Sequence, residues 1–242
     1  MTASVLPRII GALGAPTFVS VVAGELGRLL RFDLAAIVMH RRARQPAVLF
    51  DNFDRVGCRS GIDNYVGHTY RMNPMLACVP TAGVCRASDF ADEGARTPSK
   101  HIVMTAEEEL GFRTVGWPQR MEEIGLYIDA WGGVLELGFY RARGRYAVSA
   151  SKLRELNDLS APVAAAFDKH ADWQARHKPF AASTLSTREQ EICALLLAGC
   201  SSQAIALRLD ISRHTVKDHR KAIFRKLQVG SLAELFARVR VS

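Results

Sequence analysis

The sequence predicts two domains of different fold class, an α+β domain over residues 1–171 and an all-α domain over residues 184–242. Three observations support this division. The first region contains both helical and alternating, strand-like patterns of apolar residues, whereas the second contains only helical ones. Between them, residues 172–183 are polar, contain Pro179 and show no sustained apolar period, so we expect a linker there.

The α+β domain is expected to hold an antiparallel sheet flanked by helices. Helices are expected at residues 16–30, 61–70, 107–111 and 149–172. Strands are expected at residues 34–40, 47–50, 124–131, 134–140 and 146–148. The strands on either side of Gly132-Gly133 are expected to form a hairpin, because paired glycines adopt the backbone angles of a tight turn.

Helix signals recur four times in the second domain. The first helix begins with a capping box, in which Ser186 and Glu189 each accept a hydrogen bond from the other's backbone amide. It ends at Gly199, a residue typical of helix C-termini. Three further helices are expected at residues 201–209, 213–227 and 231–239. A short helix, a tight turn and a capped basic helix are typical of a helix-turn-helix, whose second helix enters the major groove of DNA.

The positive charge of the chain is concentrated in this second domain. The formal net charge of the chain is +8, and residues 183–242 carry ten Lys and Arg against five Asp and Glu. Six of those ten bases lie between Arg213 and Lys226, within the predicted basic helix. A basic stripe on a surface helix is often only a solvated face, but here it lies opposite the apolar residues and behind a capped turn. These features together favour nucleic-acid binding.

Residues 185–229 resemble the LuxR-type (GerE-like) helix-turn-helix of bacterial transcription regulators. The positions that match the family pattern are Leu185, Arg188, Glu189, Glu191, Gly199, Ile205, Ala206, Leu209, Ser212, Thr215, Val216, Lys217, His219, Lys226 and Leu227. The departures are small, with Ser202-Gln203-Ala204 in place of the commoner Asn-Lys-Glu and Asp210 where Gly is frequent. The resemblance implies a four-helix DNA-binding domain.

The same resemblance implies which side chains of the third helix contact DNA. It places three of them toward base edges, Lys217, Asp218 and Lys221. It places three others toward phosphates, Arg213, Thr215 and Arg220. A lysine can donate to guanine O6 and N7, and a carboxylate can accept from cytosine N4. Asp218 has a second interpretation, which is that it pairs with a nearby Arg or Lys of the same helix.

The first domain is similar, in its order of elements, to the GAF/PAS-like sensory domains that precede such helix-turn-helix domains, including those of acyl-homoserine-lactone receptors. Tyr65, Tyr70 and Asn73-Pro74 correspond to the tyrosine and Asp-Pro that line those receptors' pockets. Asn73 replaces the acid that accepts the ligand's amide N–H, and the pocket tryptophan four residues before a tyrosine has no counterpart. Because a neutral amide oxygen accepts less strongly than a carboxylate, we expect an effector other than a standard lactone. The candidate effector-binding residues are Tyr65, Tyr70, Asn73, Trp117 and Trp131.

Two functions remain open for the first domain. It either binds a small molecule that changes DNA affinity, or it only dimerises or binds a protein partner. The aromatic candidates do not separate these alternatives, because ligand pockets and protein cores are both mostly apolar.

The sequence does not favour an enzyme, so catalysis remains only a remote alternative. It contains no H-x-x-x-H pair, no G-x-S-x-G, no P-loop and no G-x-G-x-x-G. A phosphorylated receiver domain would open with an apolar strand that ends in adjacent acids, and residues 4–18 contain no acid. The five cysteines form no C-x-x-C pair, so a zinc site and a disulfide framework are not expected. We expect no cofactor and no metal.

The expected partners are double-stranded DNA with a palindromic operator and a second copy of the chain. A symmetric dimer would place two recognition helices about 34 Å apart, the spacing of successive major grooves. A small-molecule effector and RNA polymerase are further candidates. The longest uncharged stretch, residues 9–24, is 16 residues long. Because a membrane-spanning helix needs about 20 apolar residues, we expect no membrane association and a cytoplasmic location.

Overall fold

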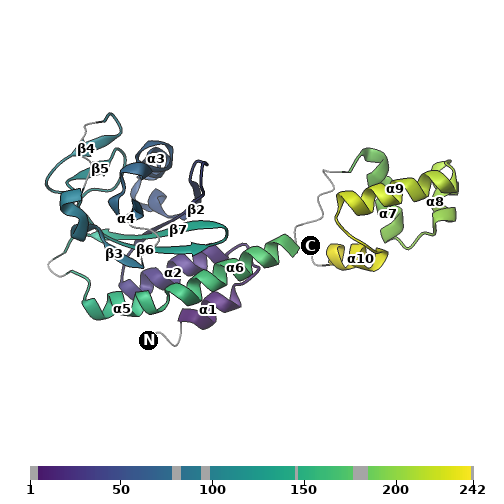
Figure 1. The fold of residues 1–242 in the computed structure, drawn as a ribbon. Helices are drawn as coiled ribbons and strands as arrows, with labels where there is room; N and C mark the ends of the chain where they lie inside the picture. Colours follow the sequence, from purple (N-terminus) through teal and green to yellow (C-terminus); the bar gives the residue numbers. More distant parts are fainter. Residues whose placement is uncertain (1–4, 78–82, 94–98, 145–146, 177–184, 241–242) are drawn as a thin grey trace. The chain divides into compact units, whose positions relative to one another are not determined.

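The computed structural model of the chain describes residues 5–77, 83–93, 99–144, 147–176 and 185–240. The chain divides into two compact units, residues 1–172 and 173–242. The first unit combines an antiparallel sheet with helices, and the second is helical (Figure 1). This confirms the predicted fold class.

A five-stranded antiparallel sheet forms the centre of the first unit. In sheet order its strands are β2 (Ala47–Asp51), β1 (Leu34–His40), β7 (Gly133–Ala142), β6 (Met121–Ala130) and β3 (Val84–Arg86). A separate two-stranded sheet pairs β4 (Ile102–Met104) with β5 (Phe112–Thr114). The predicted hairpin is confirmed as β6–β7, although its turn lies one residue earlier than expected, at Trp131-Gly132. Both turn residues have positive φ, and Gly133 pairs with Ala130 as the first residue of β7.

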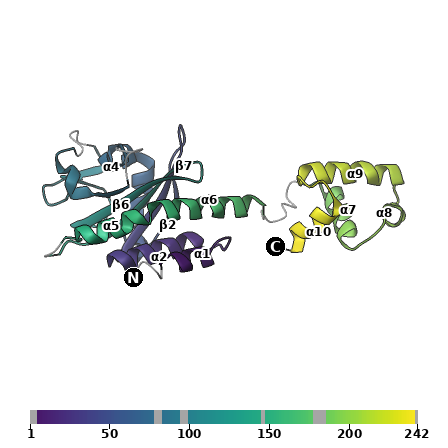
Figure 2. The same ribbon diagram turned by 60° about the horizontal axis from the view of Figure 1, so that its bottom comes forward.

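Helices cover both faces of the sheet (Figures 1 and 2). One face carries α1 (Val5–Gly11), α2 (Phe18–Leu30), α5 (Ala150–Asp158) and α6 (Ser160–Arg176). The opposite face carries α3 (Arg59–Asn64), the π-helical turn η3 (Tyr65–Thr69), η4 (Tyr70–Met72) and α4 (Pro74–Ala77), with β4 and β5 beside them. Two 3₁₀ turns, η2 (Phe53–Val56) and η5 (Ala87–Glu93), complete the unit. Helix α6 extends through Arg176, into residues expected to be linker, and the rest of that stretch lies outside the described residues.

Two local predictions are wrong. Residues 107–111 form a turn between β4 and β5 instead of a helix. Gly111 has a φ of 70° there. The carboxylates of Glu108 and Glu109 accept hydrogen bonds from the backbone amides of Arg120 and Glu123, so they hold this loop against the segment that leads into β6. The strand expected at residues 146–148 is also missing from its described part, where the amide of Val148 donates to the carboxylate of Glu122 instead.

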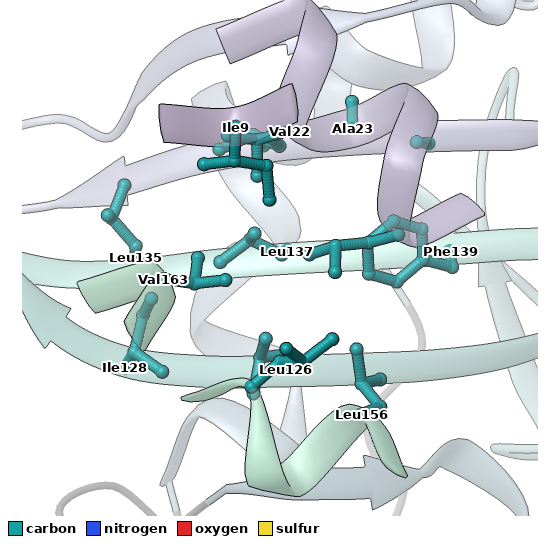
Figure 3. Packing of buried hydrophobic residues seen from close by; sticks show 14 of the residues in the cluster. Ile9, Val22, Ala23, Leu126, Ile128, Leu135, Leu137, Phe139, Leu156 and Val163 are labelled. Atoms are coloured by element: carbon teal, nitrogen blue, oxygen red, sulfur yellow. The ribbon is translucent and has the colours of Figure 1, made fainter. Parts of the chain in front are cut away.

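The main core lies between the sheet and the helical layer formed by α1, α2, α5 and α6. Alternation along the strands sends Leu135, Leu137 and Phe139 of β7 to this face, and all three are fully buried. Figure 3 shows them facing side chains of the helices, among them Val22 of α2 and Val163 of α6. The opposite face of the same strands is therefore free to carry polar side chains.

The second unit consists of four helices around a small core of its own. They are α7 (Thr187–Leu197), α8 (Ser202–Leu209), α9 (Arg213–Lys226) and α10 (Leu232–Arg240). The predicted capping box of Ser186 with Glu189 is confirmed, and Ser212 caps α9 by accepting a hydrogen bond from the amide of Thr215. The buried core residues are Leu185, Ile192, Cys193, Leu196, Ile205, Ala206, Val216, Ile223, Leu227, Val229 and Leu235.

Truncation of the central core residue Leu137 should destabilise the protein strongly. Leu137 has no exposed surface, so Leu137→Ala leaves a cavity and should lower the free energy of unfolding by about 2–5 kcal/mol. The matched control is Leu207→Ala on α8, since Leu207 is 76% exposed and its truncation should change stability by less than about 0.5 kcal/mol. Urea denaturation followed by circular dichroism measures both, and equal effects would contradict the described core.

Candidate functional site

The basic helix α9 presents its charge on one side. Val216 and Ile223 are buried in the small core. Arg213, Lys217 and Lys221 are exposed, and their spacing of four residues places them along one face of the helix. The turn before α9 is tight because Asp210 adopts a left-handed conformation, with a φ of 51°. The helix-turn-helix predicted from the sequence is therefore present with an exposed basic stripe.

The other predicted DNA-contacting residues have partners within α9. Thr215 lies 2.8 Å from the hydroxyl of its cap, Ser212, so its side chain is held at the start of the helix. The guanidinium of Arg220 lies 5.2 Å from the ring centroid of Phe224 and is half-buried. Asp218 is exposed, and its carboxylate lies 3.6 Å from Nε2 of His214, not beside an Arg or Lys of the helix.

Two basic residues of the family pattern, Arg188 and Lys226, join the helices of the domain to one another. Nζ of Lys226 lies 2.6 Å from Oε2 of Glu189, which joins the end of α9 to the start of α7. This hydrogen bond, together with those from Ser186, lowers the pKa of Glu189 to about 2. A guanidinium nitrogen of Arg188 donates to the carbonyl oxygen of Leu209 at 2.7 Å, which ties α7 to the end of α8. Both contacts fix the angle between the helices that position α9.

In the first unit, the candidate site lies on the sheet face opposite α2 and α6. Strands β6 and β7 carry the same pattern there, Glu123-x-Gly125-x-Tyr127 and Glu136-x-Gly138-x-Tyr140. The antiparallel register places the two glycines opposite each other, and each tyrosine opposite the other strand's glutamate. A Cβ at Gly125 would lie 2.5 Å from the Tyr127 ring, so the glycines leave the space in which the tyrosine rings lie across the sheet.

The two glutamates of this repeat have different surroundings. Glu136 is 3% exposed, and both of its oxygens accept hydrogen bonds from the hydroxyl of Tyr65, at 2.8 and 2.7 Å. Asn73 donates to it from Nδ2 at 2.9 Å, and Nε2 of His40 lies 2.6 Å away. The hydroxyl of Tyr127 is 3.3 Å from the same carboxylate. Glu136 is therefore a buried acid surrounded by hydrogen-bonding partners, which is how a carboxylate is accommodated away from water.

Glu123, by contrast, faces a cavity. Its carboxylate accepts one hydrogen bond, from the hydroxyl of Tyr140 at 3.2 Å, among the residues that the structure describes. Burial, followed by repulsion from Glu136, raises its pKa to about 8. Glu109 lines the same cavity, and burial raises its pKa above the ordinary value. No positive charge is among the causes of the shift of the Glu123 pKa, whereas the charge of Arg143 partly offsets the rise of the Glu109 pKa.

The cavity has a volume of about 70 Å³. It is lined by Tyr65, Thr69, Asn73, Ala87, Glu108, Glu109, Leu110, Phe112, Arg113, Thr114, Trp117, Pro118, Met121, Glu123 and Tyr140. Three of the five predicted effector-binding residues, Tyr65, Asn73 and Trp117, are thus brought together at one place. Trp117 reaches it because Gly61 and Gly116 let the loop approach α3 closely, where a Cβ at Gly61 would lie 2.5 Å from the Gly116 carbonyl oxygen.

The structure does not bring the other two predicted effector-binding residues to this cavity. Trp131 lies at the β6–β7 turn, where its ring packs against Phe167 and His170 of α6, on the helical side of the sheet. Tyr70 lies 5.9 Å from His40 and lines a separate polar groove with Arg41. The prediction for Tyr70 rests on the family resemblance and that for Trp131 on its aromatic ring, and neither residue lines the cavity.

The signal for the missed acids is present in the sequence. The repeated Glu-x-Gly-x-Tyr pattern places one acid and one tyrosine of each strand on the same face, opposite an apolar face.

Two other features are absent from the described residues. No group of three or more His, Cys, Asp or Glu side chains there is arranged to hold a metal ion. Within the same residues, no helix is long and apolar enough to cross a membrane.

Removal of the Glu136 carboxylate should destabilise the first unit. Glu136→Ala leaves the buried hydroxyl of Tyr65 and Nε2 of His40 without the carboxylate that they contact, so we expect a loss of about 3–5 kcal/mol in the free energy of unfolding. Glu136→Gln keeps an acceptor oxygen and should lose clearly less. Urea denaturation of both variants provides the measurement. Equal stability of Glu136→Ala and the wild type would mean that the network contributes nothing.

Comparison with known proteins gives a consistent result. The family model of bacterial regulatory proteins of the luxR family matches residues 183–239. An HTH-type transcriptional regulator in the exeN 3′ region of Aeromonas salmonicida is 31% identical over 149 residues, which are 52% of this chain and 74% of that protein. The response regulator protein TodT of Pseudomonas putida is 46% identical over 52 residues, only 22% of this chain and 23% of its own length. Among solved structures, the LBD domain of VqsR from Pseudomonas aeruginosa is similar with a TM-score of 0.48 and 16% identity, covering 71% of this chain and 96% of that one.

Proposed function

The chain belongs to the LuxR family of bacterial transcriptional regulators, and on this premise we propose that it binds a palindromic operator as a homodimer and that a small molecule in its first domain modulates that binding. The observation that carries the DNA-binding part is the exposed stripe of Arg213, Lys217 and Lys221 on a capped helix of a helix-turn-helix. A helix of this kind fits the major groove, where lysine donates to guanine. The proposed location is the cytoplasm. The proposed partners are double-stranded DNA and RNA polymerase.

Base contacts are assigned to Lys217, Asp218 and Lys221, and phosphate contacts to Arg213, Thr215 and Arg220. Exposure supports the first group, since all three side chains are accessible. Asp218 can accept from a cytosine amine, since its contact with His214 at 3.6 Å leaves other acceptor positions of the exposed carboxylate open. Lys226 is left out of the DNA-contacting set because it is bound to Glu189.

Replacement of Lys221 should weaken specific DNA binding. Lys221→Ala removes a donor to a base edge, so the affinity for the operator should fall by about 1–3 kcal/mol. The operator is first selected from a random double-stranded library with the full-length protein, and gel-shift titration then gives the affinities. The control is Lys100→Ala, an exposed lysine of the first unit whose loss should leave affinity unchanged. Equal affinities of Lys221→Ala and the wild type would remove this residue from the base-contacting set.

The proposal of a small-molecule effector rests on the cavity beside Tyr65, Asn73 and Trp117. Its volume of about 70 Å³ is small compared with the roughly 300–1,000 Å³ of typical ligand pockets. The effector is therefore expected to insert a compact head group instead of a long acyl chain.

A second candidate function, a regulator that dimerises without an effector, is favoured by one specific observation. The hydroxyl of Tyr65 and Nδ2 of Asn73 already donate to Glu136, and Oδ1 of Asn73, the acceptor that the family resemblance assigns to a ligand, accepts the amide of Met75 at 3.0 Å. In this alternative the polar network has only a structural role.

A thermal-shift screen of the full-length protein should separate the two functions. At a concentration of 100 times the dissociation constant, an effector should stabilise the protein by about 2.7 kcal/mol and raise Tm measurably. We expect at least one compact compound to do so and N-octanoyl-homoserine lactone to have no effect. Ala87→Leu, which fills the cavity from a residue that is 1% exposed, should abolish the response and leave DNA binding intact. Stabilisation by no compound would favour the effector-independent dimer.

A further inference from the structure

Three aromatic rings form a corner at the cavity. The ring centroids of Tyr65 and Trp117 are 5.4 Å apart with an interplanar angle of 54°. Those of Trp117 and Tyr140 are 5.5 Å apart with an angle of 78°. All three residues line the cavity, so it is bordered by aromatic surfaces of different orientation. Aromatic rings at a cavity can attract a cation through the negative charge on their π-faces.

Carboxylates complete the lining of the cavity. Glu108 lies 3.3 Å from Nε of Arg113, so these two charges compensate each other. Glu109 and Glu123 have no such ion pair among the described residues, and each carboxylate accepts a single hydrogen bond, from the Glu123 amide and the Tyr140 hydroxyl respectively. The cavity therefore combines aromatic walls with two carboxyl groups that have no ion pair among the described residues.

We propose that this cavity binds a small organic cation, a methylated ammonium head group, that contacts the rings of Tyr65, Trp117 and Tyr140 and pairs with Glu123 and Glu109. The inference rests on the proposed effector function and names the chemical class of the effector. Aromatic rings attract such cations and tolerate their methyl groups, and the carboxylates supply the counter-charge. The volume of about 70 Å³ is roughly half that of a cavity that accepts benzene, so only the head group is expected to enter and the rest of the ligand lies outside.

The repeated strand pattern shows why Glu123, and not Glu136, serves this purpose. The two acids occupy equivalent positions in Glu-x-Gly-x-Tyr segments of β6 and β7. Glu136 is surrounded by Tyr65, Asn73, Tyr127 and His40. Within the described part of the chain, Glu123 accepts a hydrogen bond from the hydroxyl of Tyr140 alone, so a cation in the cavity can pair with it without displacing another side chain.

Binding should depend on pH through Glu123. The groups that face it are Glu136 and Tyr140 on β7 and Glu109 on the β4–β5 loop, and burial with the charge of Glu136 holds its pKa at about 8. Below this pH a cation must displace a proton, so the affinity should rise about tenfold per pH unit between pH 6 and 7 and level off above about pH 8. A quaternary ammonium ion keeps its charge throughout, so the change reports on the protein.

The experiment compares choline with its neutral isostere 3,3-dimethylbutan-1-ol on the full-length protein by isothermal titration calorimetry. Potassium chloride at matched ionic strength gives the reference. We expect choline to bind at least tenfold more tightly than the isostere, and Glu123→Gln and Trp117→Leu each to weaken it at least tenfold. Glu107→Gln is the matched control, because Glu107 is an exposed acid of the same loop that pairs with Arg120 and does not line the cavity.

The outcomes separate the inference from the function on which it rests. Equal binding of the isostere, or unchanged choline affinity of Glu123→Gln, overturns the cationic effector. If choline does not bind while another compound of the thermal-shift screen does, the effector function stands and its chemical class is wrong. If no compound binds, both fail.

Discussion

The buried carboxylate of Glu136 is the constraint around which the first unit is arranged. A carboxyl group buried on the central strand of a sheet is costly unless it is hydrogen-bonded, and groups from four different parts of the chain supply the partners. Tyr65 comes from η3, Asn73 from the segment before α4, Tyr127 from β6 and His40 from β1. Because these contacts converge on one side chain, they fasten the layer of short helices to the sheet. The cavity lies where that layer leaves space over the neighbouring strand.

Contacts between residues that are close in the chain can be predicted from the sequence, whereas contacts between distant residues, such as those of Glu136, cannot. The β6–β7 hairpin, the capping box at Ser186 and the basic helix behind Ser212 depend on residues close together in the chain, so local patterns reveal them. Strands β3, β4 and β5 have three residues each, too few for an alternating pattern to emerge. The turn at residues 107–111 was expected to be a helix because its glutamates favour helices, whereas their carboxylates accept amides from distant residues. Such contacts follow from tertiary structure and have no local signal.

The residues of the candidate sites were also predicted only in part from the sequence. Trp117 reaches Tyr65 only because Gly61 and Gly116 allow two backbones to meet, a relation across fifty residues that no periodicity shows. In the second domain, the composition does not distinguish between the six basic residues of α9. The structure shows that one of them, Lys226, forms an internal ion pair with Glu189. The net charge thus indicated the helix that is proposed to bind DNA. Which of its basic residues have a structural role became clear only from the packing of α7 against α9.

The contrast between Glu136 and Glu123 also bears on how an effector could act. A ligand shifts a protein between two states only as far as it interacts differently with them. Glu136 has its partners without any ligand, so its interactions give little difference. In the proposed complex, the charge of Glu123 and the environment of Glu109 change when the cation enters the cavity. Since Glu109 also accepts the backbone amide of Glu123, the same carboxylate fastens the β4–β5 loop to β6 and faces the effector. In this proposal, an effector in the cavity therefore changes how stably the β4–β5 loop is held against β6 and leaves the stability of the sheet unchanged.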